Sequence, residues 1–202
     1  MTTGQKTVQK TFSFEGVGLH TGKTCHVMVS PLPPGSGLRI FRSDLKAEIL
    51  VSPEKVTSTA RGTTLSGEKG AQVHTIEHFL AATRGMGIDN LKIEMDSEEM
   101  PIMDGSSAPF CELFQKAGIQ DQGTPVSPLR VTETIELSFG DVYLKAEPAD
   151  GLYLDVTTSF PYPGLEDQKR SFHLGNGHFQ AELAHARTFC FEEEVQQLRE
   201  QA

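Results

Sequence analysis

The stretch Val73-His74-Thr75-Ile76-Glu77-His78-Phe79-Leu80 places a carboxylate beside an imidazole at the start of an apolar repeat. Apolar residues recur at helical spacing from Ile76 onward, which predicts a helix with this face turned toward a core. Thr75 is the expected N-cap, because a threonine hydroxyl can accept a hydrogen bond from the first turn. Glu77 and His78 then lie in that turn, where the helix dipole favours a carboxylate.

The same stretch allows two other interpretations. His74 and His78 flank Glu77 as H-x-x-E-H, a motif in which two histidines bind zinc and the glutamate is the base of a peptidase. That peptidase hypothesis needs His74 inside the helix, whereas a cap at Thr75 leaves His74 in the extended segment before it. Glu77 and His78 could also be a solvated helix start without any chemistry, since short motifs occur by chance.

Composition narrows the class of protein. The chain has 202 residues, enough for one large domain or two of about 100 residues. A formal net charge of −9 argues against general nucleic-acid binding, which needs a basic face. No apolar run reaches the roughly 20 residues of a membrane span, and the polar start has no signal-peptide core. These features predict a cytoplasmic protein.

The cysteines and glycines predict structure more than chemistry. Cys25, Cys111 and Cys190 have no C-x-x-C spacing, so we expect buried free thiols, and any zinc site would need histidine and carboxylate ligands. Gly16 to Gly22 has three glycines in seven residues, which predicts a tight turn; a phosphate-binding loop is disfavoured because no helix pattern follows it. Asp104 precedes Gly105, which favours an Asx-type turn over a ligand role.

Each half of the chain has the pattern of a sheet with helices. After the first helix, alternation over 90–95 predicts a strand, and Phe110, Phe114 and Ala117 predict a second helix that ends at Gly118. Residues 120–128 are polar and contain glycine and proline, which is typical of a domain boundary. Beyond it we predict a three-strand meander (129–138, 142–147 and 151–158), a polar loop (161–170), a helix over about 179–186 and further helical spacing up to Leu198.

The predicted fold class is therefore α+β, with two similar two-layer α/β sandwich domains, each a sheet plus two helices. We place the first domain at 1–122, where it carries Glu77 and His78, and the second at 123–202, incomplete and cut within an insert.

Taken together, five motifs resemble the signature series of one family, the zinc-dependent UDP-3-O-acyl-N-acetylglucosamine deacetylases of lipid A synthesis in Gram-negative bacteria. The resemblance extends from Lys6 to about Arg199. The motifs are Gly16-Val17-Gly18-Leu19-His20-Thr21-Gly22, Thr75-Ile76-Glu77-His78, Gly87-Ile88-Asp89-Asn90, Pro101-Ile102-Met103-Asp104-Gly105-Ser106 and Ala186-Arg187-Thr188-Phe189.

The resemblance implies roles for four residues. His78 would be one of three zinc ligands, and Glu77 would be the general base that acts on a zinc-bound water. Thr188 would steady the oxyanion, and Phe189 would lie beside the glucosamine unit. Zinc is the implied cofactor, and UDP-3-O-acyl-N-acetylglucosamine is the implied small-molecule substrate of a full-length protein that we expect to be a monomer.

Three departures from the family pattern matter. Its other zinc ligands, a histidine and an aspartate spaced i and i+4, and its general-acid histidine are expected beyond Ala202, so we expect the 202 residues to be a fragment, inactive by themselves. The family's Phe-x-His-Pro appears as Phe160-Pro161-Tyr162-Pro163, and Val142 stands where a basic residue near the nucleotide is expected. The alternative function is a truncated, non-catalytic homologue that only binds a nucleotide sugar or a partner.

Overall fold

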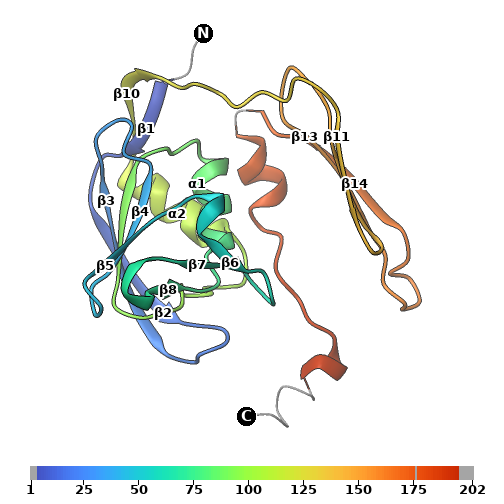
Figure 1. Cartoon of the computed structure of the whole chain (residues 1–202), viewed down its shortest axis with the longest axis horizontal. Helices are drawn as coiled ribbons and strands as arrows, with labels where there is room; N and C mark the ends of the chain where they lie inside the picture. The colour runs from blue at the N-terminus through green and yellow to red at the C-terminus, as the bar shows by residue number, and fades with distance from the viewer. Residues whose placement is uncertain (1–3, 176, 196–202) are drawn as a thin grey trace.

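A computed structural model describes residues 4–175 and 177–195. It confirms the α+β class. A first part, up to β10 (Ile119–Pro125), surrounds two helices, and a second part consists of two long hairpins followed by a C-terminal segment (Figure 1). None of the described helices has the length and apolar character that crossing a membrane requires. The predicted division at residues 122 and 123 falls within β10 and stays a prediction.

A five-stranded sheet in the order β2-β3-β9-β4-β5 is the framework of the first part. All neighbouring strands are antiparallel except β4 and β9, which are parallel. In β3 and β9 every second side chain is buried, because a half-buried strand alternates between two faces. The strands are β2 (Phe12–Val17), β3 (Thr24–Pro31), β4 (Leu38–Arg42), β5 (Ala47–Leu50) and β9 (Leu91–Met95).

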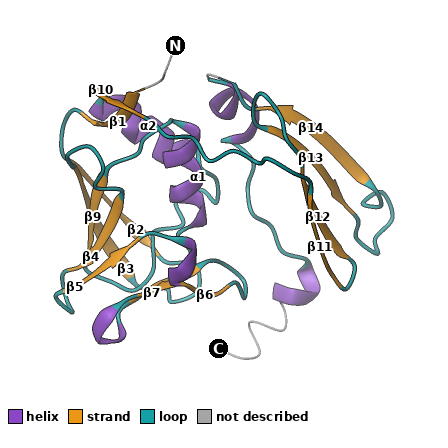
Figure 2. Ribbon diagram, turned by 45° about the horizontal axis from the view of Figure 1, so that its top comes forward, coloured by secondary structure: helices purple, strands orange, loops and turns teal. Residues whose placement is uncertain are grey.

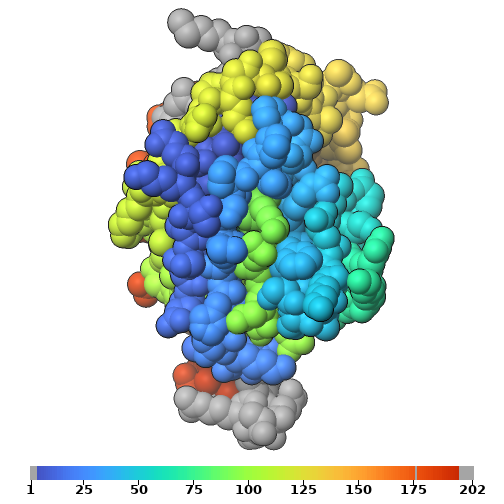
Figure 3. All heavy atoms as spheres, turned by 90° about the vertical axis from the view of Figure 1, so that its left-hand side faces the viewer, coloured from blue at the N-terminus to red at the C-terminus, as the bar shows by residue number. Residues whose placement is uncertain are grey.

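Two helices, α1 (Glu77–Gly85) and α2 (Ala108–Ala117), cover one face of this sheet (Figure 2). Phe79 of α1 and both Phe110 and Phe114 of α2 are fully buried, with ring centroids 5.5 Å apart in edge-to-face pairs around Phe79. The strands of the sheet lie side by side on the opposite face, which the helices leave open (Figure 3). The first part is thus a two-layer sandwich, as predicted.

Two smaller sheets complete the first part. β1 (Gly4–Val8) pairs with β10, so residues 119–125 form a strand where the sequence predicted a boundary. The sequence did not predict this strand, because local composition cannot show the pairing edge that β1 offers. The second small sheet, in the order β6-β7-β8, leads into α1. Its strands are β6 (Val56–Ser58), β7 (Thr64–Ser66) and β8 (Gln72–Val73), with short helical turns η1 (Pro53–Lys55) and η2 (Glu68–Gly70) beside them.

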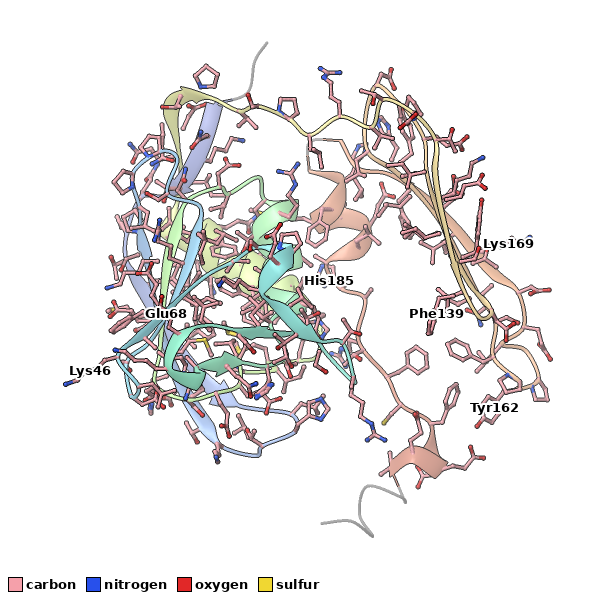
Figure 4. The ribbon with its side chains drawn as sticks, viewed as in Figure 1. Lys46, Glu68, Phe139, Tyr162, Lys169 and His185 are labelled. Atoms are coloured by element: carbon pink, nitrogen blue, oxygen red, sulfur yellow. The ribbon has the colours of Figure 1, made fainter. Side chains whose placement is uncertain are left out.

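The second part differs from the predicted meander. β11 (Ile135–Phe139) pairs with β12 (Val142–Ala146), and β13 (Tyr153–Thr158) pairs with β14 (Gln168–His173), as two separate hairpins. The sequence did not predict β14, because most of its residues are polar and exposed, and its backbone pairing with β13 supplies the order. Phe139 and Tyr162 lie at the same end of the two hairpins (Figure 4).

The structure also differs from the sequence predictions in the C-terminal segment and at one cysteine. The predicted helix over 179–186 is a short π-helical turn, η3 (Phe179–Leu183), whose Phe179 ring packs on Gly85 of α1. Cys25 and Cys111 are buried free thiols as expected, whereas Cys190 is exposed. The helical spacing that ends at Leu198 falls partly outside the described residues.

The fold predicts that Phe79→Ala costs about 3–5 kcal/mol of unfolding free energy, because it removes a buried ring and leaves a cavity. Urea unfolding followed by circular dichroism measures this loss. Phe139→Ala is the matched control: its ring is 88% exposed, so the variant should unfold like the parent chain. Equal effects of the two substitutions would contradict the assignment of the core.

Candidate functional site

Glu77 and His78 open α1, as the sequence predicted. Glu77 Oε2 accepts a hydrogen bond of 2.8 Å from the backbone N–H of Thr63, which fixes the direction of the carboxylate. Its other oxygen lies 3.9 Å from Nε2 of His78. The side chains of His78 and Glu77 are 16% and 36% exposed, so both groups can meet a ligand. The structure therefore brings a carboxylate and an imidazole together at an accessible helix start.

The helix does not begin as predicted. Its N-cap residue is Ile76, and Thr75 lies before it with φ at 56°, a left-handed conformation that is a genuine outlier for a β-branched residue. The Thr75 hydroxyl donates to Glu99 Oε1 at 2.9 Å instead of capping the helix. Thr75 was misassigned because the partner of its hydroxyl, Glu99, comes from a distant segment.

His74 lies outside α1, at the end of β8, where it pairs with the segment around Glu99. Its Nδ1 is 3.0 Å from the Thr64 hydroxyl. The peptidase hypothesis needs His74 one helical turn before His78, and the structure does not provide that arrangement.

The loop before α2 connects His78 with the C-terminal segment. The Ser107 hydroxyl donates to the His78 carbonyl oxygen at 3.0 Å, and the Ser107 N–H donates to the Ala184 carbonyl oxygen at 3.0 Å. Ser107 thus contacts α1 through its side chain and, through its backbone, the segment that leads to Thr188. Asp104 has the turn role that the sequence favoured, since its Oδ1 accepts from both the N–H and the hydroxyl of Ser106.

Thr188 lies against that loop. Its N–H donates to the Gly105 carbonyl oxygen at 2.9 Å, and a Cβ on Gly105 would lie 3.7 Å from its methyl group. Arg187 adds an ion pair of 3.7 Å to Asp104, whose pKa is lowered by the Ser106 hydroxyl and, against some burial, by the Arg187 charge. The ion pair is exposed and adds little stability.

Phe189 is 65% exposed and packs edge to face with Phe160 and Phe191, at centroid distances of 5.5 and 5.6 Å. The hydroxyl of Tyr162 donates to Glu193, and its ring stacks on Phe191 at 4.4 Å. Phe189 therefore belongs to an aromatic cluster in the second part.

A pocket of about 300 Å³ opens beside the loop between β6 and β7, which contains Thr63 and is called the Thr63 loop below. Arg61 and Gly62 form part of its wall, and a Cβ on Gly62 would lie 3.3 Å from Glu77 Oε1. From the sequence, the polar stretch 57–64 could equally line a pocket or form a solvated strand, and the structure places Arg61 and Gly62 in a pocket wall. The lining residues are His20, Thr21, Ala60, Arg61, Gly62, Thr64, His74, Thr75 and Glu99.

Glu99 is the buried charge of this pocket, 1% exposed. Its oxygens accept the N–H groups of His20 and Thr21 and the Thr75 hydroxyl, at 2.8 to 3.2 Å. Burial raises the pKa of Glu99, but the hydrogen bonds from His20, Thr21 and Thr75 together outweigh burial and hold this pKa below its usual value. Glu99 is thus a carboxylate held in its charged form.

The described residues do not complete a zinc site. A catalytic zinc needs three protein ligands and an open position. Within residues 4–175 and 177–195, no group of three histidine, cysteine or acidic side chains could hold a metal ion. His78 with Glu77 is therefore at most part of such a site.

Comparison with known proteins gave consistent matches. Residues 5–202 match the model of the LpxC family, UDP-3-O-acyl N-acetylglycosamine deacetylase. Relatives named UDP-3-O-acyl-N-acetylglucosamine deacetylase from Wolinella succinogenes and Anaeromyxobacter dehalogenans are 42% and 40% identical over 195 residues, 96% of this chain. The chain spans 65% and 63% of their respective lengths.

The geometry of Glu99 predicts a pH dependence of stability. Because its pKa is lower in the folded protein than the ordinary 4.5, its contribution is fully present above that value and is lost as pH falls through the folded pKa. Glu99→Gln should lower unfolding free energy at pH 7 by about 1–3 kcal/mol and flatten the decline below pH 5. Urea unfolding at several pH values measures both effects, with the exposed Glu112→Gln as control; parallel profiles would contradict the prediction.

Proposed function

The chain belongs to the UDP-3-O-acyl N-acetylglycosamine deacetylase family, and we propose that it acts in hydrolysis of the N-acetyl group of UDP-3-O-acyl-N-acetylglucosamine. This reaction would be the committed step of lipid A synthesis. The observation that carries the proposal is the Glu77 carboxylate, held by the Thr63 N–H next to the His78 imidazole at an accessible helix start.

Amide hydrolysis needs a base that activates water. In the proposed reaction Glu77 takes a proton from water as the oxygen attacks the acetamide carbonyl carbon. The carbon–nitrogen bond then breaks, an acid protonates the amine, and acetate and a free amino sugar result. A base positioned in this way contributes about 10²- to 10⁴-fold to the rate. The hydrogen bond from Thr63 supports this role, because it leaves one Glu77 oxygen free to accept the proton.

We propose that the Thr188 hydroxyl donates a hydrogen bond to the oxyanion that forms during attack. Such a bond strengthens as negative charge develops. The position of Thr188 against Gly105 supports the assignment, because the same loop contacts His78 through Ser107. We also propose that Phe189 packs beside the glucosamine unit, for which its exposed ring is suited.

Zinc dependence is part of the proposal, with His78 as one imidazole ligand. A zinc ion would act as a Lewis acid toward the carbonyl and the water. The described residues do not complete its ligand set, so the two further ligands have to come from outside them. We propose a cytoplasmic monomer that acts on a small molecule, without nucleic-acid binding.

The base assignment predicts that Glu77→Gln lowers kcat by about 10²- to 10⁴-fold in a chain extended to the length of its relatives. Glutamine keeps the shape and can still accept from Thr63, but it cannot take the proton. Release of acetate from the substrate measures the loss. Glu112→Gln, exposed on α2, should be as active as the parent, and full activity of Glu77→Gln would refute the role.

The ligand assignment predicts a different outcome for metal content. In the extended chain, elemental analysis should find about one zinc per protein, and His78→Ala should lose it, because three protein ligands are needed. Glu77→Gln should retain the zinc. If the extended chain contains no zinc and binds the substrate in calorimetry but does not deacetylate it, the non-catalytic alternative is favoured.

A further inference from the structure

Glu99 lies in the wall of the pocket, on the segment that follows β9. A buried carboxylate costs free energy unless its oxygens accept hydrogen bonds. Its donors are the N–H groups of His20 and Thr21 and the Thr75 hydroxyl, and all three residues line the same pocket. Among the described residues no lysine, arginine or histidine forms an ion pair with Glu99. We infer that Glu99 is a positioning residue that sets the direction of the Glu77 carboxylate. This inference rests on the function proposed above.

The first route from Glu99 to Glu77 runs through Thr75. Thr75 has the left-handed φ of 56° and is buried, a conformation that costs about 1–3 kcal/mol and persists only when its surroundings enforce it. Its hydroxyl is held by Glu99 Oε1 at 2.9 Å. Because Thr75 joins β8 to α1 two residues before Glu77, its backbone angles set the direction in which the first turn of the helix begins.

The second route runs through the glycine-rich turn. Glu99 accepts the N–H groups of His20 and Thr21, and the His20 ring donates from Nε2 to the Arg61 carbonyl oxygen at 3.0 Å. Arg61 also has a left-handed φ, of 57°. Two residues later, Thr63 donates its N–H to Glu77. The first route thus supports Glu77, the acceptor of this hydrogen bond, and the second supports Thr63, its donor.

Packing and pairing support a fixed placement of Glu99. A Cβ on Gly18 would lie 2.4 Å from Glu99 Oε2, so the carboxylate fits only against a glycine. The flanking residues pair with the end of β8: the His74 N–H donates to the Glu98 carbonyl oxygen at 2.8 Å, and the Met100 N–H donates to the His74 carbonyl oxygen at 3.1 Å. The carboxylate therefore stands on anchored backbone.

The test compares Glu99→Gln with Glu98→Gln in the extended chain. Glu98 is the neighbour in sequence, but its side chain is partly exposed and pairs only with Lys23 among the described residues. Glu99→Gln should lower kcat by about 10- to 100-fold with KM changed by less than about threefold, because misplacing a reacting group costs rate rather than binding. Glu98→Gln should match the parent. All variants are assayed at a temperature at which circular dichroism shows each of them to be folded.

A second readout is independent of activity. Hydrogen exchange of the Thr63 amide, which donates to Glu77, should become at least about tenfold faster in Glu99→Gln and stay unchanged in Glu98→Gln, because loss of the support opens that bond. Unchanged exchange and unchanged kcat in a folded Glu99→Gln variant would overturn the inference. Faster exchange in a protein that deacetylates nothing would support the positioning role and reject the proposed function.

If Glu99→Gln does not fold, two less disruptive variants of Thr75 test the inference. Thr75→Val removes only the hydroxyl that Glu99 holds, and Thr75→Ser retains it. Positioning predicts a kcat reduced by about tenfold in Thr75→Val and near the parent value in Thr75→Ser, with Thr63 exchange faster in the first alone. Equal kcat and equal exchange in the two variants would refute it.

Discussion

The burial of Phe79 among Phe14, Phe110 and Phe114 is the contact on which the rest of the structure depends. It joins both helices to the sheet and fixes the rotation of α1 about its axis. Glu77 and His78 are the two residues before Phe79, and successive helical residues point about 100° apart. Once Phe79 faces the core, these two side chains cannot share its direction. The hydrophobic core therefore determines which groups of the helix remain available for chemistry.

The two parts of the chain are held together in different ways. The first has a continuous core, whereas most side chains of the hairpins are exposed. The link between the parts is local: Phe179 packs on Gly85, Ser107 binds the backbone of Ala184, and Thr188 binds Gly105. All of these contacts involve α1 or the loop before α2. Thr188 is therefore placed by the same elements that place His78, although the two are far apart in sequence.

Periodicity and motifs predicted both helices, the accessible Glu77 and His78, and the turn at Asp104. They failed where a residue's partner is distant. Thr75 is a residue type that often caps helices, but its hydroxyl binds Glu99 instead. The strand β10 forms because β1 pairs with it. Glu99 was not predicted at all, since Glu98 and Glu99 are alike in sequence and only the register beyond β9 shows which one is buried. An acidic pair shortly after a buried strand is the signal that could have found it.

The parallel pairing of β4 with β9 has a consequence for how the protein matures. Residues 43–90 form the whole connection between these strands, and they include the Thr63 loop, Thr75, Glu77 and His78. A parallel pair forms only after its connection has closed, and closing a long loop costs entropy before any contact compensates it. By this argument the side chains of the candidate site reach their final arrangement late in folding. The candidate site is therefore complete only in a chain whose central strand pair has formed.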